Sequence, residues 1–338
     1  MVLACAWLSG CASGLPRVVV KLGEGDTTPA AVQRPFLIAS DDAEATRIAA
    51  DALRAGGSAA DAAVAAAFAL TVTLPSSASL SARGACLVHN AGSGATDALI
   101  FAPDSPGDQP LAHAMLTIHG TMGVLPWARA VAPAANLARF GQPVSRMLAA
   151  RLAHADSLLN DGQALAVFMS PRRQLLAEGE VLRQPALAAA LDRLRGVPRG
   201  AAAGVLPWSR SRSENRDGAH VFSVDPQHTV AALPDGATGL VVGDQKGNAV
   251  ACVFTLGRAF GSGVMQDGAL TPSADAAPLL PVMTVDAKGR VLRAVASAGG
   301  DTLVNMFVCR LDNDALQCEA KADARGGGYA LAGAPGEP

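Results

Sequence analysis

The sequence predicts an α+β fold in which helices are layered on antiparallel sheet. Through residues 41–195 apolar side chains recur mainly at helical spacing, whereas after residue 220 they alternate along short segments separated by turns that contain glycine. Helices that come first and hairpins that come later favour this class over repeating β-α-β units. The composition is 50% hydrophobic but only 4% aromatic. We therefore expect layers that pack closely through small residues.

Composition and charge exclude several classes of partner. The 338 residues have room for one large domain or two modest ones, and the formal net charge of -2 comes without a basic stripe, so no nucleic-acid partner is expected. The six histidines and six cysteines show no metal-ligand spacing, so neither a metal nor a cofactor is expected. The most apolar segment, residues 59–72, is too short to span a membrane and contains Asp61.

The N-terminus predicts export. Residues 1–11, MVLACAWLSGC, are typical of a lipoprotein signal, in which a small residue precedes a cysteine that is lipidated and becomes the new N-terminus. That cysteine is Cys11. Residues 12–35 are rich in proline, glycine and threonine and would form a tether. The protein would then be periplasmic and held at the membrane by its lipid anchor. The alternative is an ordinary apolar N-terminus.

Two helices are predicted after a strand at residues 35–40. The first helix spans 41–57, where acidic residues open it and a pair of glycines ends it. Ser58 can cap a second, alanine-rich helix that runs to about Leu70. Two helices joined by a glycine turn predict a packed helical hairpin.

The next segments mix strands and helices. Strand-like pieces occur at 85–90 and 97–102, with turn residues between them. Further helices are predicted within 123–145, at 146–159, and at 185–195, where a proline occupies the first turn. We interpret residues 195–220, which are rich in Arg, Ser and Gly, as an exposed loop or the remnant of a deletion.

Two hairpins follow, at residues 238–255 and 281–300, and the glycine-rich tail from 321 to 338 is predicted to be irregular. Cys309 and Cys318 are separated by a short loop and could pair in an oxidising compartment, with buried free thiols as the alternative.

Five segments, taken together, resemble the γ-glutamyltranspeptidase family, and they occur in the family's order over residues 36–335. They are IASDDAEATRIAADALRAGGSAADAAVAAAFAL, GVLPWARAVAPAANLARFGQPVS, LLAEGEVLRQPALAAALDRL, GDQKGNAVACVFTLGRAFGSG and ADARGGGYALAG. The resemblance implies an N-terminal-nucleophile hydrolase with an αββα sandwich, here truncated. Residues 36–232 would be the large-subunit-like part and 233–338 the small-subunit-like part of one composite domain.

The resemblance also implies a mechanism. The family's precursor cuts its chain before a threonine, and the freed threonine takes the γ-glutamyl group from glutathione or a related amide. The family motif is two threonines and a histidine, then a strand ending in Asp-x-x-Gly-Asn, which matches the sequence at Asp244. Counting back without a gap places the catalytic threonine on Ala237 and the second threonine on Thr238. A one-residue deletion would make Thr238 the nucleophile. The histidine is absent under either count.

The resemblance assigns roles to three further residues. Thr255 falls on a family threonine thought to assist the nucleophile. Gly299 and Gly300 match the paired glycines whose backbone N–H groups form the oxyanion hole. The family's paired serines fall on Ala277 and Pro278, which lack a hydroxyl.

The arginine that grips the substrate's α-carboxylate in this family falls on Ala102. Arg83, in the segment before it, could supply the charge instead, or it could be a solvated surface residue.

Two functions therefore remain open. One is a γ-glutamyltransferase-like enzyme that acts on a small glutathione-like substrate through Thr238. The other is a family descendant without catalysis that persists as a lipid-anchored binding or structural protein. A third possibility is a truncated reading frame that folds poorly. Whether the chain is an enzyme is not decided by its sequence.

Overall fold

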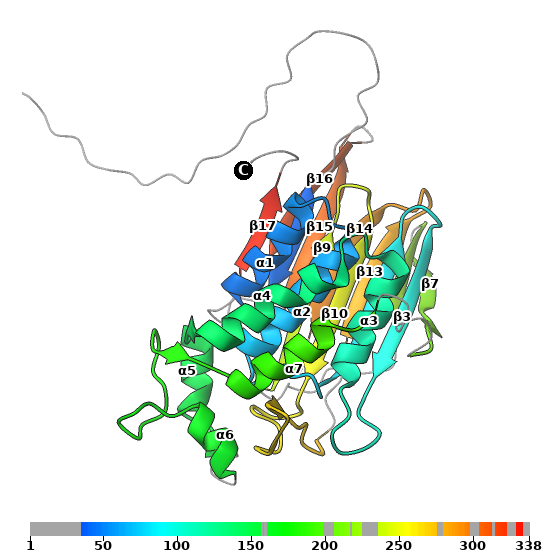
Figure 1. Ribbon diagram of the computed structural model, residues 1–338. Helices are drawn as coiled ribbons and strands as arrows, with labels where there is room; N and C mark the ends of the chain where they lie inside the picture. The colour runs from blue at the N-terminus through cyan, green and yellow to red at the C-terminus, as the bar shows by residue number, and fades with distance from the viewer. Residues whose placement is uncertain are drawn as a thin grey trace, which may run out of the picture. The chain divides into compact units, whose positions relative to one another are not determined.

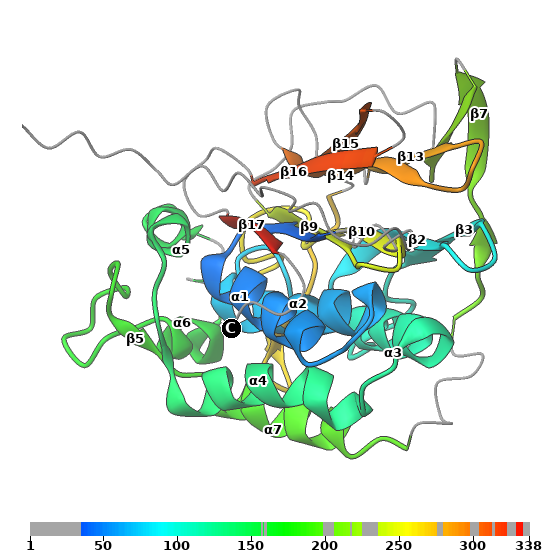
Figure 2. The same ribbon diagram turned by 90° about the horizontal axis from the view of Figure 1, so that it is seen from above.

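The structure, a computed structural model, describes residues 35–156, 158, 161–198, 206–216, 218–224, 236–275, 280–297, 304–312, 315–322 and 329–333. All of these residues belong to one unit, Gln33–Pro338. Two antiparallel sheets face each other, and helices cover the other side of the first sheet (Figures 1 and 2). The α+β class is confirmed.

The first sheet has the strand order β17-β1-β9-β10-β2-β3-β6. Its strands are β1 (Phe36–Ser40), β2 (Arg83–Asn90), β3 (Ala95–Phe101), β6 (Ser209–Arg210), β9 (Ala237–Gly243), β10 (Ala249–Thr255) and β17 (Tyr329–Gly333). The central strands β9 and β10 are buried along their whole length, as expected for a sheet covered on both faces.

The second sheet has the order β16-β15-β14-β13-β8-β7. Its strands are β7 (Arg212–Arg216), β8 (Ala219–Ser223), β13 (Leu280–Asp286), β14 (Val291–Ser297), β15 (Val304–Asp312) and β16 (Ala315–Lys321). A core of mostly small and branched residues fills the space between the sheets, including Val241, Ala251, Met283 and Phe307. Short strand pairs β4 (Gln142–Pro143) with β5 (Val181–Leu182), and β11 (Met265–Gln266) with β12 (Ala269–Leu270), lie outside both sheets.

The helices are α1 (Ala43–Arg54), α2 (Ala59–Thr73), α3 (Pro110–Met122), α4 (Trp127–Phe140), α5 (Arg146–Leu152), α6 (Gly162–Val167) and α7 (Pro185–Arg195). In Figure 2, α1, α2, α3, α4 and α7 lie below the first sheet, and α5 lies to the side. The alanine-rich α2 is buried along its whole length because it lies between the sheet and α4, and α7 packs on α4. None of the described helices combines the length and apolar character needed to cross a membrane.

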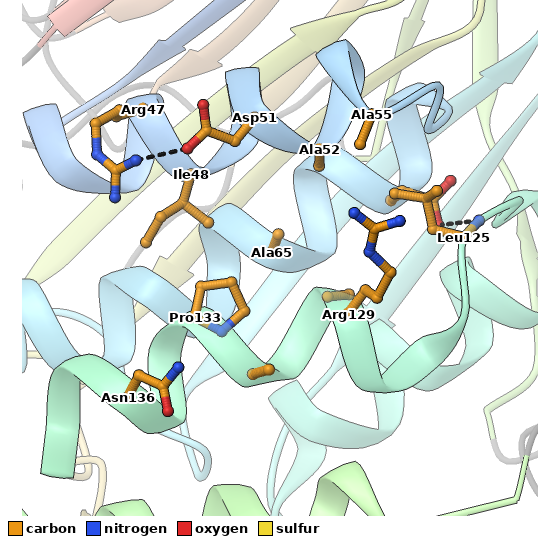
Figure 3. Close-up of a pocket in the computed structure, with 13 residues that line it drawn as sticks. Arg47, Ile48, Asp51, Ala52, Ala55, Ala65, Leu125, Arg129, Pro133 and Asn136 are labelled. Atoms are coloured by element: carbon orange, nitrogen blue, oxygen red, sulfur yellow. Dashed lines mark hydrogen bonds and ion pairs between the residues drawn. The ribbon is translucent and has the colours of Figure 1, made fainter.

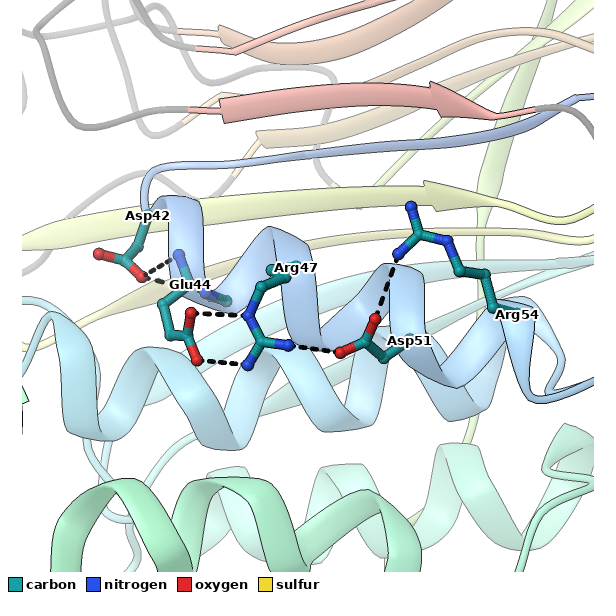
Figure 4. Close-up of polar contacts among 6 residues, drawn as sticks. Asp42, Glu44, Arg47, Asp51 and Arg54 are labelled. Atoms are coloured by element: carbon teal, nitrogen blue, oxygen red, sulfur yellow. Dashed lines mark hydrogen bonds and ion pairs between the residues drawn. The ribbon is translucent and has the colours of Figure 1, made fainter. Parts of the chain in front are cut away.

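Helices α1 and α2 begin as their sequences predict. Asp42 caps α1 by accepting the N–H groups of Glu44 and Ala45, and Ser58 and Asp61 form a capping box on α2. Charged side chains along the solvent side of α1 form a ladder of ion pairs in which Arg47 contacts Glu44 and Asp51 (Figure 4). The apolar side of the same helix packs on β1 and α2.

The hairpin between β9 and β10 turns at the Asp-x-x-Gly-Asn sequence. Asp244 Oδ1 accepts the N–H groups of Lys246 and Asn248, and Gly247 has a φ of 90°, which favours glycine. Asp244 Oδ2 accepts the N–H of Ala59 at the start of α2. One carboxylate therefore fixes both the turn and the helix that packs beneath it.

Two disulfides link directly opposite residues of paired strands. Cys309 on β15 bonds Cys318 on β16, which is the disulfide rather than the free-thiol alternative that the sequence left open. Cys86 on β2 bonds Cys252 on β10, a pair that the sequence analysis missed because 166 residues separate the two cysteines.

Several elements differ from the sequence predictions. The interpretation of 195–220 as an exposed loop is wrong for residues 209–216 and 219–220, which form β6, β7 and the start of β8. The prediction of an irregular tail is wrong for β17, which pairs with β1 along its whole length, and most of the remaining tail lies outside the described residues. Helix α3 and strands β15 and β16 were not predicted. Among the described residues, helices cover only the first sheet. Compared with the predicted αββα sandwich, the helical layer on the second sheet is absent from this part of the chain.

Asp61 joins three segments at the start of α2. Its carboxylate accepts the N–H groups of Ser58, Val124 and Leu125, and His119 Nε2 lies 3.2 Å from its Oδ1. Burial alone would raise the pKa of Asp61, but these donors outweigh burial and lower the pKa from 3.8 to about 2. The ionised carboxylate therefore holds α2, the end of α3 and the segment before α4 together.

We predict that Asp61→Asn lowers the free energy of unfolding at neutral pH by about 2 kcal/mol. The folded pKa of Asp61 lies below its unfolded value, so its contribution is present above about pH 4 and is lost as the pH falls toward 2. Urea unfolding at several pH values measures this. A variant with the same stability and the same acid dependence as the wild type would contradict the prediction.

Candidate functional site

Strand pairing sets three residues in one row at the end of the first sheet. Thr255 lies opposite Ala237 on β9 and opposite Arg83 on β2. Ala102 follows Phe101, the residue of β3 that pairs with Gly84. Directly opposed residues share a face of the sheet. This face points to the second sheet, because Ala237 packs in the core between the sheets. The structure thus brings Thr255, Arg83 and Ala237 together in one row.

Thr238 belongs to the other face. Its cross-strand partner is Phe254, which packs in the core beneath the helices. Thr238 is 0% exposed, and its hydroxyl donates to Asp41 Oδ2 over 2.7 Å. Because side chains alternate along a strand, Thr238 and Thr255 cannot share a face while β9 and β10 keep this register.

Asp41 is the centre of a buried polar cluster. Its Oδ2 also accepts the N–H of Gly239 at 3.3 Å, and its Oδ1 accepts Asn305 Nδ2 at 2.7 Å. Asn305 donates as well to the carbonyl of Gly239. Asp41 and Asn305 are each 2% exposed. The cluster connects the end of β1, the start of β9 and strand β15 of the second sheet.

Sequence reasoning missed Asp41 and Asn305. Asp41 was grouped with Asp42 as an acidic residue opening α1, but only Asp42 caps the helix. The sequence holds one local signal for Asp41. A helix needs only one N-cap side chain, so one of the two adjacent aspartates must have another role.

Two donors converge on the carbonyl oxygen of Gly236, the residue before Ala237. The N–H of Leu256 donates over 2.8 Å and the hydroxyl of Thr255 over 3.1 Å. The residue that follows this carbonyl, Ala237, has no side-chain hydroxyl.

Gly239 stands two residues after Ala237, where the ungapped count expects the histidine. A Cβ at this position would lie 2.9 Å from the Cβ of Ala296 on β14. The two sheets therefore approach each other too closely for any side chain here, and the loss of the histidine is built into their packing.

Arg83 is a partly exposed cation in this row. Its Nη1 donates to the backbone carbonyl of Asp275 over 3.1 Å, and it forms no ion pair with a carboxylate of the described residues. The carboxylate of Asp275 pairs instead with Arg258. The remaining donors of Arg83 are therefore available to an anionic ligand.

The other predicted site residues lie outside the described residues. These are Cys11, Gly299 and Gly300, together with Ala277 and Pro278. Within the described ranges, no three His, Cys, Asp or Glu side chains gather as metal ligands.

Comparison with known proteins bears on both fold and family. The cephalosporin acylase from Bacillus halodurans has a similar structure, with a TM-score of 0.68 and 14% identity over 93% of this chain and 99% of that chain. The family model described as Gamma-glutamyltranspeptidase matches residues 45–110 and 110–202. The glutathione hydrolase proenzyme of Escherichia coli (strain K12) is 34% identical over 185 residues, 46% of this chain.

The facing sheets and the helical layer define an N-terminal-nucleophile hydrolase fold in truncated form. Within that class, residues 45–202 match the γ-glutamyltranspeptidase family model, so this part of the chain is similar to that family. The aligned region spans 32% of the E. coli relative. The residues that match the family model end at 202, before the row on β9 and β10.

We predict that Thr238→Val destabilises the protein by roughly 1–3 kcal/mol, because it removes a donor from a buried carboxylate while keeping the side-chain shape. Thr238→Ser keeps the hydroxyl and serves as the matched control, so it should retain most of the stability. Urea unfolding measures the difference. Equal stability of Thr238→Val and the wild type would show that the hydroxyl has no structural role.

Proposed function

We propose that this chain is a γ-glutamyltransferase-like protein that does not cleave itself and binds carboxylate-bearing small molecules of the glutathione class without turning them over. This is the non-catalytic alternative that its sequence left open. The single observation that carries it is the pairing of Ala237 with Thr255, which puts an alanine where a nucleophilic hydroxyl is needed.

The surroundings of Ala237 support this assignment. Thr255 and the N–H of Leu256 still hold the carbonyl of Gly236, as an autoprocessing site requires. Alanine has no atom that could attack that carbonyl. Attack by a hydroxyl at this position would be the first step of both cleavage and acyl transfer.

Thr238 fits a structural role better than a catalytic one. A nucleophile must reach a substrate, whereas Thr238 is completely buried and its hydroxyl donates a hydrogen bond to Asp41. The same contact favours the active alternative in one respect, since a carboxylate beside a hydroxyl is a possible general base. An enzyme acting through Thr238 is therefore the second candidate.

Arg83 supports retention of ligand binding. It lies directly opposite Thr255 in the strand register, so a cation occurs beside that threonine although Ala102 lacks one. Guanidinium groups bind carboxylates through two parallel hydrogen bonds. An α-carboxylate of a glutathione-like molecule is the ligand group that this arrangement suits.

We also propose that the protein is exported and anchored through a lipid on Cys11. The two disulfides support an oxidising compartment. Expression of the full chain in a bacterium with lipoprotein processing should yield a membrane-fraction protein that begins at an acylated Cys11, as read by mass spectrometry. A secreted or cytosolic product that retains residues 1–11 would refute the anchor.

The test of function uses the protein from residue 12 onward in oxidised form. After long incubation its intact mass should correspond to one uncut chain, and it should not hydrolyse a γ-glutamyl anilide. Glutathione should bind in a titration, and Arg83→Gln should weaken binding about tenfold because a charge-assisted contact is lost.

Arg139→Gln is the matched control, since Arg139 pairs with Asp192 on the helical side of the molecule. It should bind glutathione like the wild type. Two fragments that meet between Ala237 and Thr238, absent from Thr238→Ala, would instead establish the active enzyme. An uncut chain that shows no Arg83-dependent binding would refute the binding role.

A further inference from the structure

A groove in the helical layer, separate from the row on β9 and β10, has the properties of a second binding site. Helices α1 and α4 both pack on α2 and leave between them a cavity of about 400 Å³ (Figure 3). Its size lies within the range of small-molecule sites. We propose that this groove binds a small organic acid with an apolar body.

The groove exists because small residues meet there. Ala52 on α1, Ala65 on α2 and Ala130 on α4 line it, with Ile48 as a larger apolar side chain. Alanines on three neighbouring helices leave space that larger side chains would fill. The resulting surface suits an apolar ligand body.

Arg129 supplies the charge. It rises from α4 into the space between the helices in Figure 3. Its guanidinium forms no hydrogen bond or ion pair with any residue that the structure describes. On the opposite wall, Asp51 is already paired with Arg47 and Arg54. The available cation thus favours an anionic ligand, and its planar donor pair suits a carboxylate.

Asp61 lies at the same end of the groove but does not compete for that role. Its oxygens accept hydrogen bonds from Ser58, Val124 and Leu125, and His119 lies beside it. No ion pair joins it to Arg129 within 4.0 Å. Arg129 therefore retains donors for a ligand.

Two further polar groups of α4 favour one orientation of the ligand. The first is the carbonyl of Arg129, which has no helical donor because Pro133, one turn later, lacks an N–H. Asn136 lines the groove seven residues after Arg129, about 10 Å along the helix, and its amide has no partner among the described residues. A ligand with its carboxylate at Arg129 would extend its apolar body toward Asn136.

The test is a calorimetric titration of the oxidised protein with octanoate, compared with the neutral analogue 1-octanol. Octanoate should bind at least tenfold more tightly than octanol. Arg129→Gln should abolish that preference by weakening octanoate about tenfold while leaving octanol unchanged. Arg139→Gln, on the same helix but outside the groove, should bind octanoate like the wild type.

Ala132→Leu provides an independent check, because the half-exposed Ala132 lines the groove and a leucine would reduce its volume. This variant should weaken octanoate and octanol alike. The proposal is overturned if octanoate does not bind, if it binds no better than octanol, or if neither Arg129→Gln nor Ala132→Leu weakens it. These results are independent of glutathione binding at Arg83.

Discussion

The pairing of β9 with β10 is the constraint on which the candidate site depends. Side chains alternate between the faces of a strand, so a register fixed at one pair fixes every other pair. With Val241 and Ala251 buried between the sheets, Ala237 and Thr255 must face the second sheet, and Thr238 must face away from it. A slip by one residue would turn Ala237 and Val241 of β9 away from the second sheet and toward the helices. The hydrophobic core therefore decides which residue of β9 lies beside Thr255.

In the buried cluster around Asp41, Thr238 acts as a hydrogen-bond donor to a carboxylate. A carboxylate buried between layers is costly unless donors surround it, and Thr238, Gly239 and Asn305 supply them from two different sheets. Gly239 permits β14 to approach closely at the same place. This end of the sandwich is thus closed by packing and by hydrogen bonds.

The sequence predicted the elements whose signals are local. Capping residues and glycine stops marked α1 and α2, and the Asp-x-x-Gly-Asn turn marked the hairpin of β9 and β10. It failed where the structure depends on distant partners. Strand β17 is short and stands in a glycine-rich tail, but β1 pairs with it along its whole length. Strand β7 is polar enough to resemble a loop, and it is a strand because it pairs with β8, which in turn pairs with β13.

By itself the sequence determined the fold class and a resemblance to one family, because these follow from the order and spacing of motifs along one chain. Only the tertiary structure decided that Ala237 lies opposite Thr255 and that Thr238 donates to Asp41. It also decided that Arg83 lies opposite Thr255. The physical reason is that a sequence can be aligned with or without a one-residue gap, whereas a one-residue shift of register in a buried sheet moves every side chain of the strand to the opposite face.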